Sequence, residues 1–257
     1  MARKKNQKNK LLILLFFLVV CVAIGLLVVI QVMYKDIFMD KQQIIYIPLG
    51  DSYTIGQDVE SDHNFPTQLT RHLKKENINI KLLLNPAVSG YTSRNVVDEE
   101  LPVFESNNPD FTTILVGTND IDQGVDQETF QRNLRIILDR VEKVTGTEGI
   151  ILLTIPDFTV TPFWKKYYGN QDAREQIDTF NSIIAEEALE RNIALVDITK
   201  LSESMESDSS LYVWDGLHPS GKEYTLWEQK IYPVMYKILS SRIKEVNENG
   251  KNDSGNN

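Results

Sequence analysis

A serine, a histidine and an aspartate stand where they could act together. Ser52 follows the apolar run IIYIPL (44–49) and lies in GDSYTIG (50–56), on a predicted tight turn that feeds a helix. Such a turn exposes the serine hydroxyl and aims the backbone N–H of the same residue at the same ligand. A serine hydroxyl is a weak nucleophile until a base takes its proton. The candidate base is His218, and Asp215, three residues earlier, could orient its ring.

Two further residues offer hydrogen-bond donors to an oxyanion. Gly90, in NPAVSGYTS (85–93), has an unobstructed backbone N–H, and Asn119, in GTND, has a side-chain amide. Each feature also has a purely structural interpretation. A serine after a strand is often a helix cap, an Asp-x-x-His spacing arises by chance, and GTND is typical of a turn. Their joint placement is therefore what favours a catalytic interpretation.

Five short apolar runs are predicted to be the strands that position these residues. The runs are nearly continuous rather than alternating, as in parallel strands buried on both faces. Because helical patterns separate them, the order indicates βαβ units and a doubly wound parallel sheet of the α/β class. Functional residues gather at the carboxyl ends of such strands, so the polar segments should converge at one edge. The five runs are 44–49, 78–84, 111–116, 150–155 and 193–198.

The sequence between the apolar runs shows the apolar stripes of helices and the residues that begin and end them. One helix should be capped by Asp126 and end near Gly146, and a last helix should start at Pro219, with Pro233 ending or kinking it. The stripe of the first is Phe130, Leu134, Ile137, Val141 and Val144, and a further helix carries Ile177, Phe180, Ile183, Ile184 and Ala188.

The polar segments resemble the sequence blocks of the SGNH (GDSL) hydrolases, which are named for a catalytic Ser, Gly, Asn and His. GDSYTIG, VSGYTS, GTND and DGLHPS match the first, second, third and fifth blocks in the order and spacing of the family, from about Ile44 to the last helix. The bacterial lysophospholipase, thioesterase and arylesterase branch is the most similar. Tyr53 stands where the family name implies Leu, and Ala87 and Tyr91 stand where a glycine and an acid are common. None of these departures removes a catalytic group, although Tyr91 could change the pocket wall.

The resemblance implies a fold and a set of roles. The fold is a three-layer α/β/α domain with a five-stranded parallel sheet, the flavodoxin-like SGNH hydrolase fold. Carried over residue by residue, the resemblance makes Ser52 the nucleophile, His218 the base and Asp215 its orienting acid. The oxyanion hole then consists of the backbone N–H groups of Ser52 and Gly90 with the Asn119 side chain. No cofactor and no metal are expected, because such a triad needs none and no cluster has ligand spacing.

The N-terminal segment predicts a membrane anchor. Leu11 to Ile30 is an apolar run of 20 residues, long enough to span a bilayer core. Basic residues precede it, so the positive-inside rule places residues 1–10 in the cytoplasm and the domain outside the cell membrane. A cleaved signal peptide is the alternative, but the run is long for one and no A-x-A-like site follows. The predicted organisation is therefore an anchor at 11–34, a hydrolase domain at 42–245 and a disordered tail at 246–257.

Charge and cysteine content argue against nucleic-acid binding, disulfides and thiol chemistry. The net charge is −9, and because residues 1–10 carry five positive charges, the remaining residues carry −14. Such an acidic chain is not expected to bind nucleic acid. Cys21, in the predicted anchor, is the only cysteine, so the domain should contain no disulfide and no catalytic thiolate. His63 and His72 fall in or next to the first helix, where a polar surface role is expected.

Three functions are compatible with the sequence. The favoured one is an anchored serine esterase or lipase for lipid-like or short acyl esters. The alternatives are an O-acetyl esterase that acts on cell-wall glycan, and an anchored binding protein that keeps the fold without chemistry. The segment 156–172 is rich in aromatic residues and either forms a wall over the acyl group or packs onto the domain. Its aromatic residues are Phe158, Phe163, Trp164, Tyr167 and Tyr168.

Overall fold

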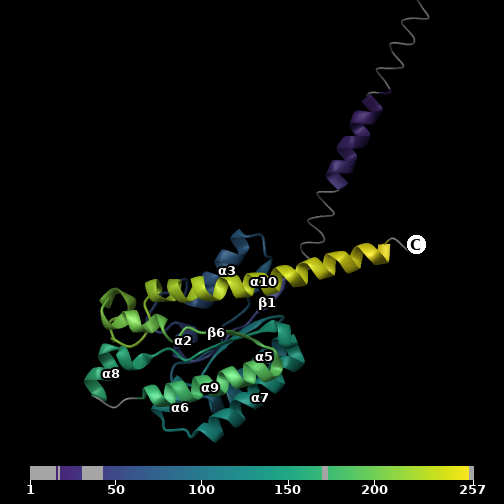
Figure 1. The fold of residues 1–257 in the computed structure, drawn as a ribbon. Coiled ribbons are helices and arrows are strands. Elements are labelled where there is room, and N and C mark those ends of the chain that lie inside the picture. Colours follow the sequence, from purple (N-terminus) through teal and green to yellow (C-terminus); the bar gives the residue numbers. More distant parts are fainter. Residues whose placement is uncertain (1–15, 17, 31–42, 170–172, 255–257) are drawn as a thin grey trace, which may run out of the picture. The chain divides into compact units, whose positions relative to one another are not determined.

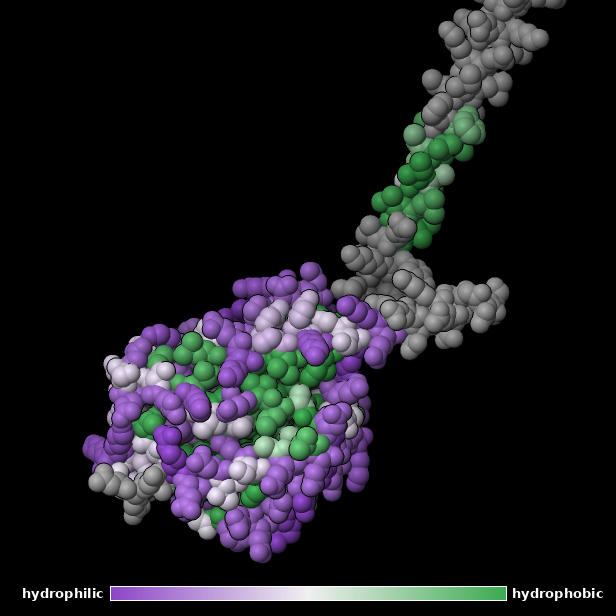
Figure 2. Space-filling model, viewed as in Figure 1, coloured by the Kyte–Doolittle hydropathy of each residue, from purple (hydrophilic) through white to green (hydrophobic). Residues whose placement is uncertain are grey.

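The structure is a computed structural model that describes residue 16 and residues 18–30, 43–169 and 173–254. By its contacts the chain divides into two units, residues 1–43 and 44–257. In the first unit, residues 18–30 are helical, and their apolar side chains are exposed (Figure 2).

The predicted anchor is only partly described. Residues 11–15, 17 and 31–34 of the anchor, and all of the basic segment 1–10, lie outside the described residues. Within the part of the chain that the structure describes, none of the helices combines the length and the apolar character needed to cross a bilayer.

The second unit contains short parallel strands at the predicted places. A four-stranded sheet has the order β2-β4-β5-β6, and β1 pairs with β3 in a separate two-stranded sheet. All of these pairs are parallel, as the near-continuous apolar runs predict. The strands are β1 (Ile44–Tyr46), β2 (Leu49–Gly50), β3 (Ile80–Leu82), β4 (Thr112–Leu115), β5 (Ile150–Leu153) and β6 (Ala194–Val196).

The prediction of one continuous five-stranded sheet is wrong: the strands form two sheets, because Pro48 divides the first predicted strand into β1 and β2. Ile47 still donates its N–H to the carbonyl oxygen of Phe111 at 3.1 Å, on the β4 side. Pro48 has no N–H to donate, so the hydrogen-bond ladder is interrupted there. The largest sheet consequently has four strands, and β2 lies at its edge.

The helices begin and end largely where the sequence signals predict. Asp126 caps α7 by accepting a hydrogen bond from the backbone N–H of Thr129, and the helix ends at Gly146, both as predicted. The apolar stripe of α9 is buried, and so is that of α7 except for Val144, which is partly buried. The main helices are α2 (Ser52–Ile55), α3 (Phe65–Lys75), α4 (Ser93–Asn95), the π-helix η1 (Val96–Glu100), α5 (Leu101–Asn107), α6 (Thr118–Asp122), α7 (Gln127–Thr145), η3 (Phe158–Val160), α8 (Pro162–Tyr167), α9 (Arg174–Arg191) and α10 (Gly221–Ser254), with shorter turns at η2 (Thr147–Gly149), η4 (Leu201–Glu206) and η5 (Ser209–Leu211).

Two layers of helices cover the two faces of the strands. Helices α3 and α10 lie on one face, and α5, α7 and α9 lie on the other (Figure 1). Alternate strand residues divide between the two cores: Ile114 and Leu152 pack with α7 and α9, whereas Leu115 and Leu153 pack with α3 and α10. Burial of each such side chain contributes about 1.5–3 kcal/mol. Because the strands are parallel, their carboxyl ends lie at one edge, where the loops that follow them can form a site.

The last helix differs from the prediction in its start and its length. It begins at Gly221 rather than Pro219 and continues through Pro233 to Ser254. Residues 246–254, predicted to be disordered from their polar composition, are therefore helical in backbone conformation, and residues 255–257 lie outside the described residues. Beyond Pro233 the helix contains no second proline that would interrupt its hydrogen bonds.

Glu223 of α10 is a buried acid that should make stability depend on pH. Its side chain is fully buried, and Oε1 accepts a hydrogen bond from Trp227 Nε1 at 2.9 Å. Burial raises the pKa of Glu223 to about 7, although the Trp227 hydrogen bond opposes the shift. In the unfolded chain the Glu223 carboxyl group ionises near pH 4.5, whereas in the folded protein it stays neutral until about pH 7. The stabilisation that the neutral group contributes is therefore lost as the pH rises from about 4.5 through about 7.

We therefore expect Glu223→Gln to reduce the pH dependence of unfolding. Glutamine keeps the acceptor for Trp227 but cannot ionise, so the variant should gain about 1–3 kcal/mol relative to the wild type between about pH 5 and about pH 8. Urea unfolding at the two pH values measures this difference. Glu245→Gln, at an exposed position of the same helix, is the control. An unchanged pH dependence in Glu223→Gln would contradict the assignment of a neutral, buried acid.

Candidate active site

A tight turn after β2 presents Ser52 as the first residue of α2. Gly50 has a φ of 154°, and a Cβ atom there would lie 2.3 Å from the carbonyl oxygen of Leu115, so only glycine fits. Asp51 caps α2, with Oδ1 accepting a hydrogen bond from the backbone N–H of Tyr53 at 3.0 Å. Ser52 is 5% exposed, so its hydroxyl is nearly removed from bulk water.

The loop before α10 brings His218 and Asp215 to this turn. His218 Nε2 lies 2.9 Å from Ser52 Oγ, and His218 Nδ1 lies 2.5 Å from Asp215 Oδ2. The three predicted residues are thus joined by hydrogen bonds in the order serine, histidine, aspartate. The loop folds back on itself, because Val213 donates its N–H to the carbonyl oxygen of His218 at 2.9 Å and Gly216 adopts a φ of +73°.

Asp215 is held as an anion beside the imidazole. Its other oxygen, Oδ1, accepts hydrogen bonds from the backbone N–H groups of Leu217 and His218 at 2.8 and 3.0 Å. Burial alone would raise the pKa of Asp215, but the hydrogen bonds from the His218 ring and these two N–H groups outweigh it and lower the pKa. A carboxylate at this position keeps a proton on Nδ1 and leaves Nε2 free to accept one.

The predicted oxyanion donors lie beside Ser52. Gly90 and Asn119 line the same cavity as Ser52, and Gly90 adopts a φ of +85°. Asn119 Nδ2 donates to the carbonyl oxygen of Tyr91 at 3.0 Å and to Asp51 Oδ2 at 3.2 Å. Both amide hydrogens are therefore engaged, and the Asn119 side chain would have to exchange one acceptor for a substrate oxygen.

The cavity at Ser52 has a volume of about 190 Å³ and an aromatic wall. Phe163 and Tyr168 line the cavity, and the backbone N–H of Phe163 donates to the carbonyl oxygen of Gly216 at 3.0 Å. Tyr168 donates its hydroxyl to Asp122 Oδ1 at 2.8 Å. The segment around α8 is thus attached at both ends, to the histidine loop and to α6.

The aromatic residues of this segment combine the two roles that the sequence left open. Phe158 and Trp164 are 2% and 7% exposed and belong to the core, yet they also line the cavity. Trp164 stacks on Tyr168 with ring centroids 4.1 Å apart. Tyr167 is 62% exposed. The segment therefore packs onto the domain and forms a cavity wall with the same side chains.

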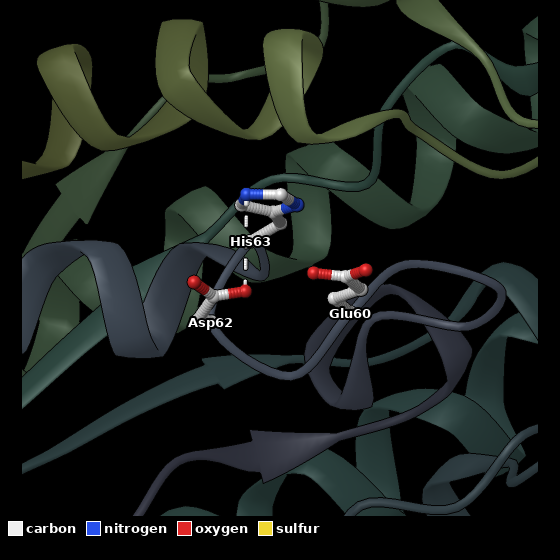
Figure 3. A group of neighbouring side chains, drawn as sticks. All are labelled: Glu60, Asp62 and His63. Carbon is white, nitrogen blue, oxygen red and sulfur yellow. Dashed lines mark ion pairs between the residues drawn. The ribbon is translucent and has the colours of Figure 1, made fainter.

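The other two histidines lie elsewhere on the domain. His72 Nδ1 lies 2.8 Å from Glu228 Oε1, and the His72 ring stacks on Tyr232. His63 belongs to an exposed group with Glu60 and Asp62 (Figure 3), in which His63 Nε2 lies 3.8 Å from Asp62 Oδ1. These three ligand-type side chains converge closely enough for a cation, but none of them lines the cavity at Ser52.

The sequence analysis did not identify three buried acids near Ser52. Burial raises the pKa of Asp51 to about 7, with the charge of Asp120 adding to the shift and hydrogen bonds from Tyr53 and Asn119 opposing it. Burial also raises the pKa of Asp120, whose Oδ1 lies 2.5 Å from Ser93 Oγ. The third acid is Glu100. Asp51 directly precedes Ser52 and Asp120 directly follows Asn119, and this adjacency could have identified both acids as site residues from the sequence.

The fold and the site together define a class of protein. A serine hydroxyl bonded to a histidine, which an aspartate orients, at the carboxyl edge of parallel strands is the geometry of a serine hydrolase. The model of the GDSL-like lipase/acylhydrolase family matches residues 49–226, and the chain belongs to this family. It is thus a GDSL-type enzyme that acts on ester bonds, as the resemblance of its sequence blocks implied.

Solved structures share the fold at low sequence identity. An esterase from Pseudoalteromonas sp., EstA, is 21% identical with a TM-score of 0.60, covering 76% of this chain and 98% of its own. TesA is 20% identical with a TM-score of 0.62, covering 77% and 99%. The acetylxylan esterase Axe2 from Geobacillus stearothermophilus is 17% identical with a TM-score of 0.58, covering 77% and 94%. No curated protein matches the sequence.

Replacement of Asn119 tests the predicted oxyanion hole. Asn119→Ala removes a side-chain donor that we expect to stabilise the oxyanion more than the bound ester, so kcat should fall by about 10²–10³ with little change in KM. Steady-state hydrolysis of p-nitrophenyl acetate measures both constants. Gln123→Ala, which removes a side chain that donates to the carbonyl oxygen of Gly90 rather than to substrate, is the comparison variant. A kcat for Asn119→Ala close to that of the wild type would contradict the assignment.

Proposed function

We propose that the protein is a membrane-anchored, extracytoplasmic serine esterase that hydrolyses short acyl esters. Ser52 is the nucleophile, His218 the general base and Asp215 the residue that orients the base. The observation that carries this proposal is the distance of 2.9 Å between His218 Nε2 and Ser52 Oγ. A proton can transfer directly over such a distance.

In the first half of the reaction, Ser52 Oγ attacks the acyl carbonyl carbon while His218 Nε2 takes the hydroxyl proton. The carbonyl oxygen becomes an oxyanion that accepts hydrogen bonds from the backbone N–H groups of Ser52 and Gly90 and from the Asn119 amide. We expect Asn119 to release its longer bond, that to Asp51 at 3.2 Å, and to keep the bond to the carbonyl oxygen of Tyr91.

Collapse of this intermediate breaks the ester C–O bond, and His218 returns its proton to the departing alkoxide. The product is the free alcohol, and the acyl group stays on Ser52 Oγ. A water molecule then attacks the acyl carbon with His218 again acting as base, which releases the acid and restores the Ser52 hydroxyl. Asp215 stays ionised and stabilises the imidazolium in both halves.

The dimensions of the cavity favour short acyl groups. Its volume of about 190 Å³ is below the range of about 300–1,000 Å³ that is usual for drug-sized ligands. The α8 segment forms one side of the cavity and is fixed by the bond between Tyr168 and Asp122. A long chain would have to displace this wall or leave the cavity, so acetyl to butyryl groups fit the proposal best.

An O-acetyl group on a cell-wall glycan is a second candidate substrate. The small cavity fits an acetyl group, and an acetylxylan esterase is among the solved structures of the same fold. Release of acetate from purified wall polymer, compared with release of fatty acid from lysophospholipid, distinguishes this substrate from a lipid.

A series of aryl esters from acetyl to palmitoyl tests the proposed activity. With the fragment 35–257, kcat/KM should be highest for the shortest esters and should fall for palmitoyl, because the α8 wall limits the acyl chain. Ser52→Ala should lower kcat by a factor of about 10³ or more and should abolish covalent labelling by a fluorophosphonate. Labelling that persists in Ser52→Ala would exclude Ser52 as the nucleophile, and a wild-type chain that neither labels nor hydrolyses would favour a non-catalytic binding protein.

The anchor is proposed from the apolar run Leu11 to Ile30, whose described side chains are exposed. When the full chain is expressed in bacteria, we expect it to stay in the membrane pellet after an alkaline carbonate wash. Protease added outside spheroplasts should digest the hydrolase domain. A chain that begins at residue 35 is the control and should be soluble. A soluble product that has lost its N-terminal segment would instead support a cleaved signal peptide.

A further inference from the structure

Glu100 binds the turn that carries the nucleophile. It is the last residue of the π-helix η1 and is 1% exposed. Its Oε2 accepts a hydrogen bond from the backbone N–H of Gly50 at 3.0 Å, and Gly50 lies two residues before Ser52. π-helices are rare in proteins but often occur at functional sites, and this one ends with a carboxyl group that is hydrogen-bonded to the turn before Ser52.

The position of Gly50 explains why its N–H needs a side-chain acceptor. Strand β2 is an edge strand whose only partner strand among the described residues is β4. Ile47 donates its N–H toward the β4 side, and N–H groups alternate along a strand. The N–H of Gly50 therefore points to the side on which β3 no longer pairs. Glu100 supplies the acceptor that a neighbouring strand would otherwise provide.

The surroundings of Glu100 favour its neutral form. Oε1 has no hydrogen-bond partner among the described residues. The cations on the adjoining helices are otherwise engaged: Arg94 of α4 pairs with Asp98, and Arg140 of α7 pairs with Glu105. Burial raises the pKa of Glu100 to about 8, the Gly50 hydrogen bond opposes the shift, and the charge of Asp51 adds to it.

We propose that Glu100 is a positioning residue of the esterase: its neutral carboxyl group holds the backbone of Gly50, and thereby the Ser52 turn, and its ionisation at alkaline pH lowers activity. This inference rests on the proposed function. An ionised Glu100 would place a second negative charge beside Asp51, close to the oxyanion that forms at Ser52, where it opposes the transition state.

The variants Glu100→Leu and Glu100→Gln separate this role from simple packing. Glu100→Leu leaves the Gly50 N–H without an acceptor, so kcat on p-nitrophenyl acetate at about pH 7 should fall by about 10- to 100-fold, whereas KM stays within about threefold. Glu100→Gln restores the acceptor and should bring kcat back to within about threefold of the wild type. Glu99→Gln, its exposed neighbour in η1, is the matched control and should behave as the wild type.

The pH profile of kcat gives the decisive readout. The wild type and Glu99→Gln should lose activity above about pH 8, and Glu100→Gln should not, because it cannot ionise. An alkaline limb that is unchanged in Glu100→Gln, or absent from the wild type, would overturn the proposal even if Glu100→Leu failed to fold. If Ser52-dependent hydrolysis is present and both Glu100 variants match Glu99→Gln, this inference fails while the proposed function stands. Absence of Ser52-dependent hydrolysis in the wild type would instead overturn both.

Discussion

The hydrogen bond between His218 and Ser52 joins residues that are 166 positions apart in the chain, and no local structure can hold such a bond. Its geometry depends on packing around both partners. Tyr53, next to Ser52, contacts the His218 ring with centroids 5.5 Å apart, and it also contacts Trp227 of α10 at 5.9 Å. Trp227 is fully buried. Helices α2 and α10 thus keep Ser52 and His218 close together through one aromatic cluster, so a displacement of α10 from the sheet would also displace Ser52.

The same region concentrates carboxyl groups that burial makes costly to ionise. Asp51, Asp120 and Glu100 are buried, and each has a pKa above its usual range. Asp215, in contrast, has its pKa lowered by hydrogen bonds from the loop that carries it. Acids with opposite pKa shifts are typical of functional sites. Here the difference follows from burial, because Asp215 lies on a partly exposed loop and the other three acids are buried.

Local sequence signals located most of the strands and helices, and they located the candidate site residues that follow strands. Asp126 and Gly146 are end signals that act within one turn of helix, so the bounds of α7 could be predicted. The site residues could be located because the carboxyl ends of parallel strands meet at one edge. Other features depend on contacts between distant segments and left no local pattern. The hydrogen bond from Gly50 to Glu100 joins residues 50 positions apart, and that from Tyr168 to Asp122 joins residues 46 positions apart. Pro48 is likewise compatible with a strand in the sequence, because only the structure shows whether a neighbouring strand needs the N–H that proline lacks.

The attachment of the α8 wall has a consequence for how this enzyme can diversify. One of the hydrogen bonds that attach it, from Phe163 N–H to the carbonyl oxygen of Gly216, is made by backbone atoms alone. Any residue other than proline at position 163 can make this backbone bond, so substitutions there can change the shape of the cavity while the histidine loop keeps this contact. Descendants of a single ancestral sequence could in this way acquire different ester preferences without passing through an inactive intermediate.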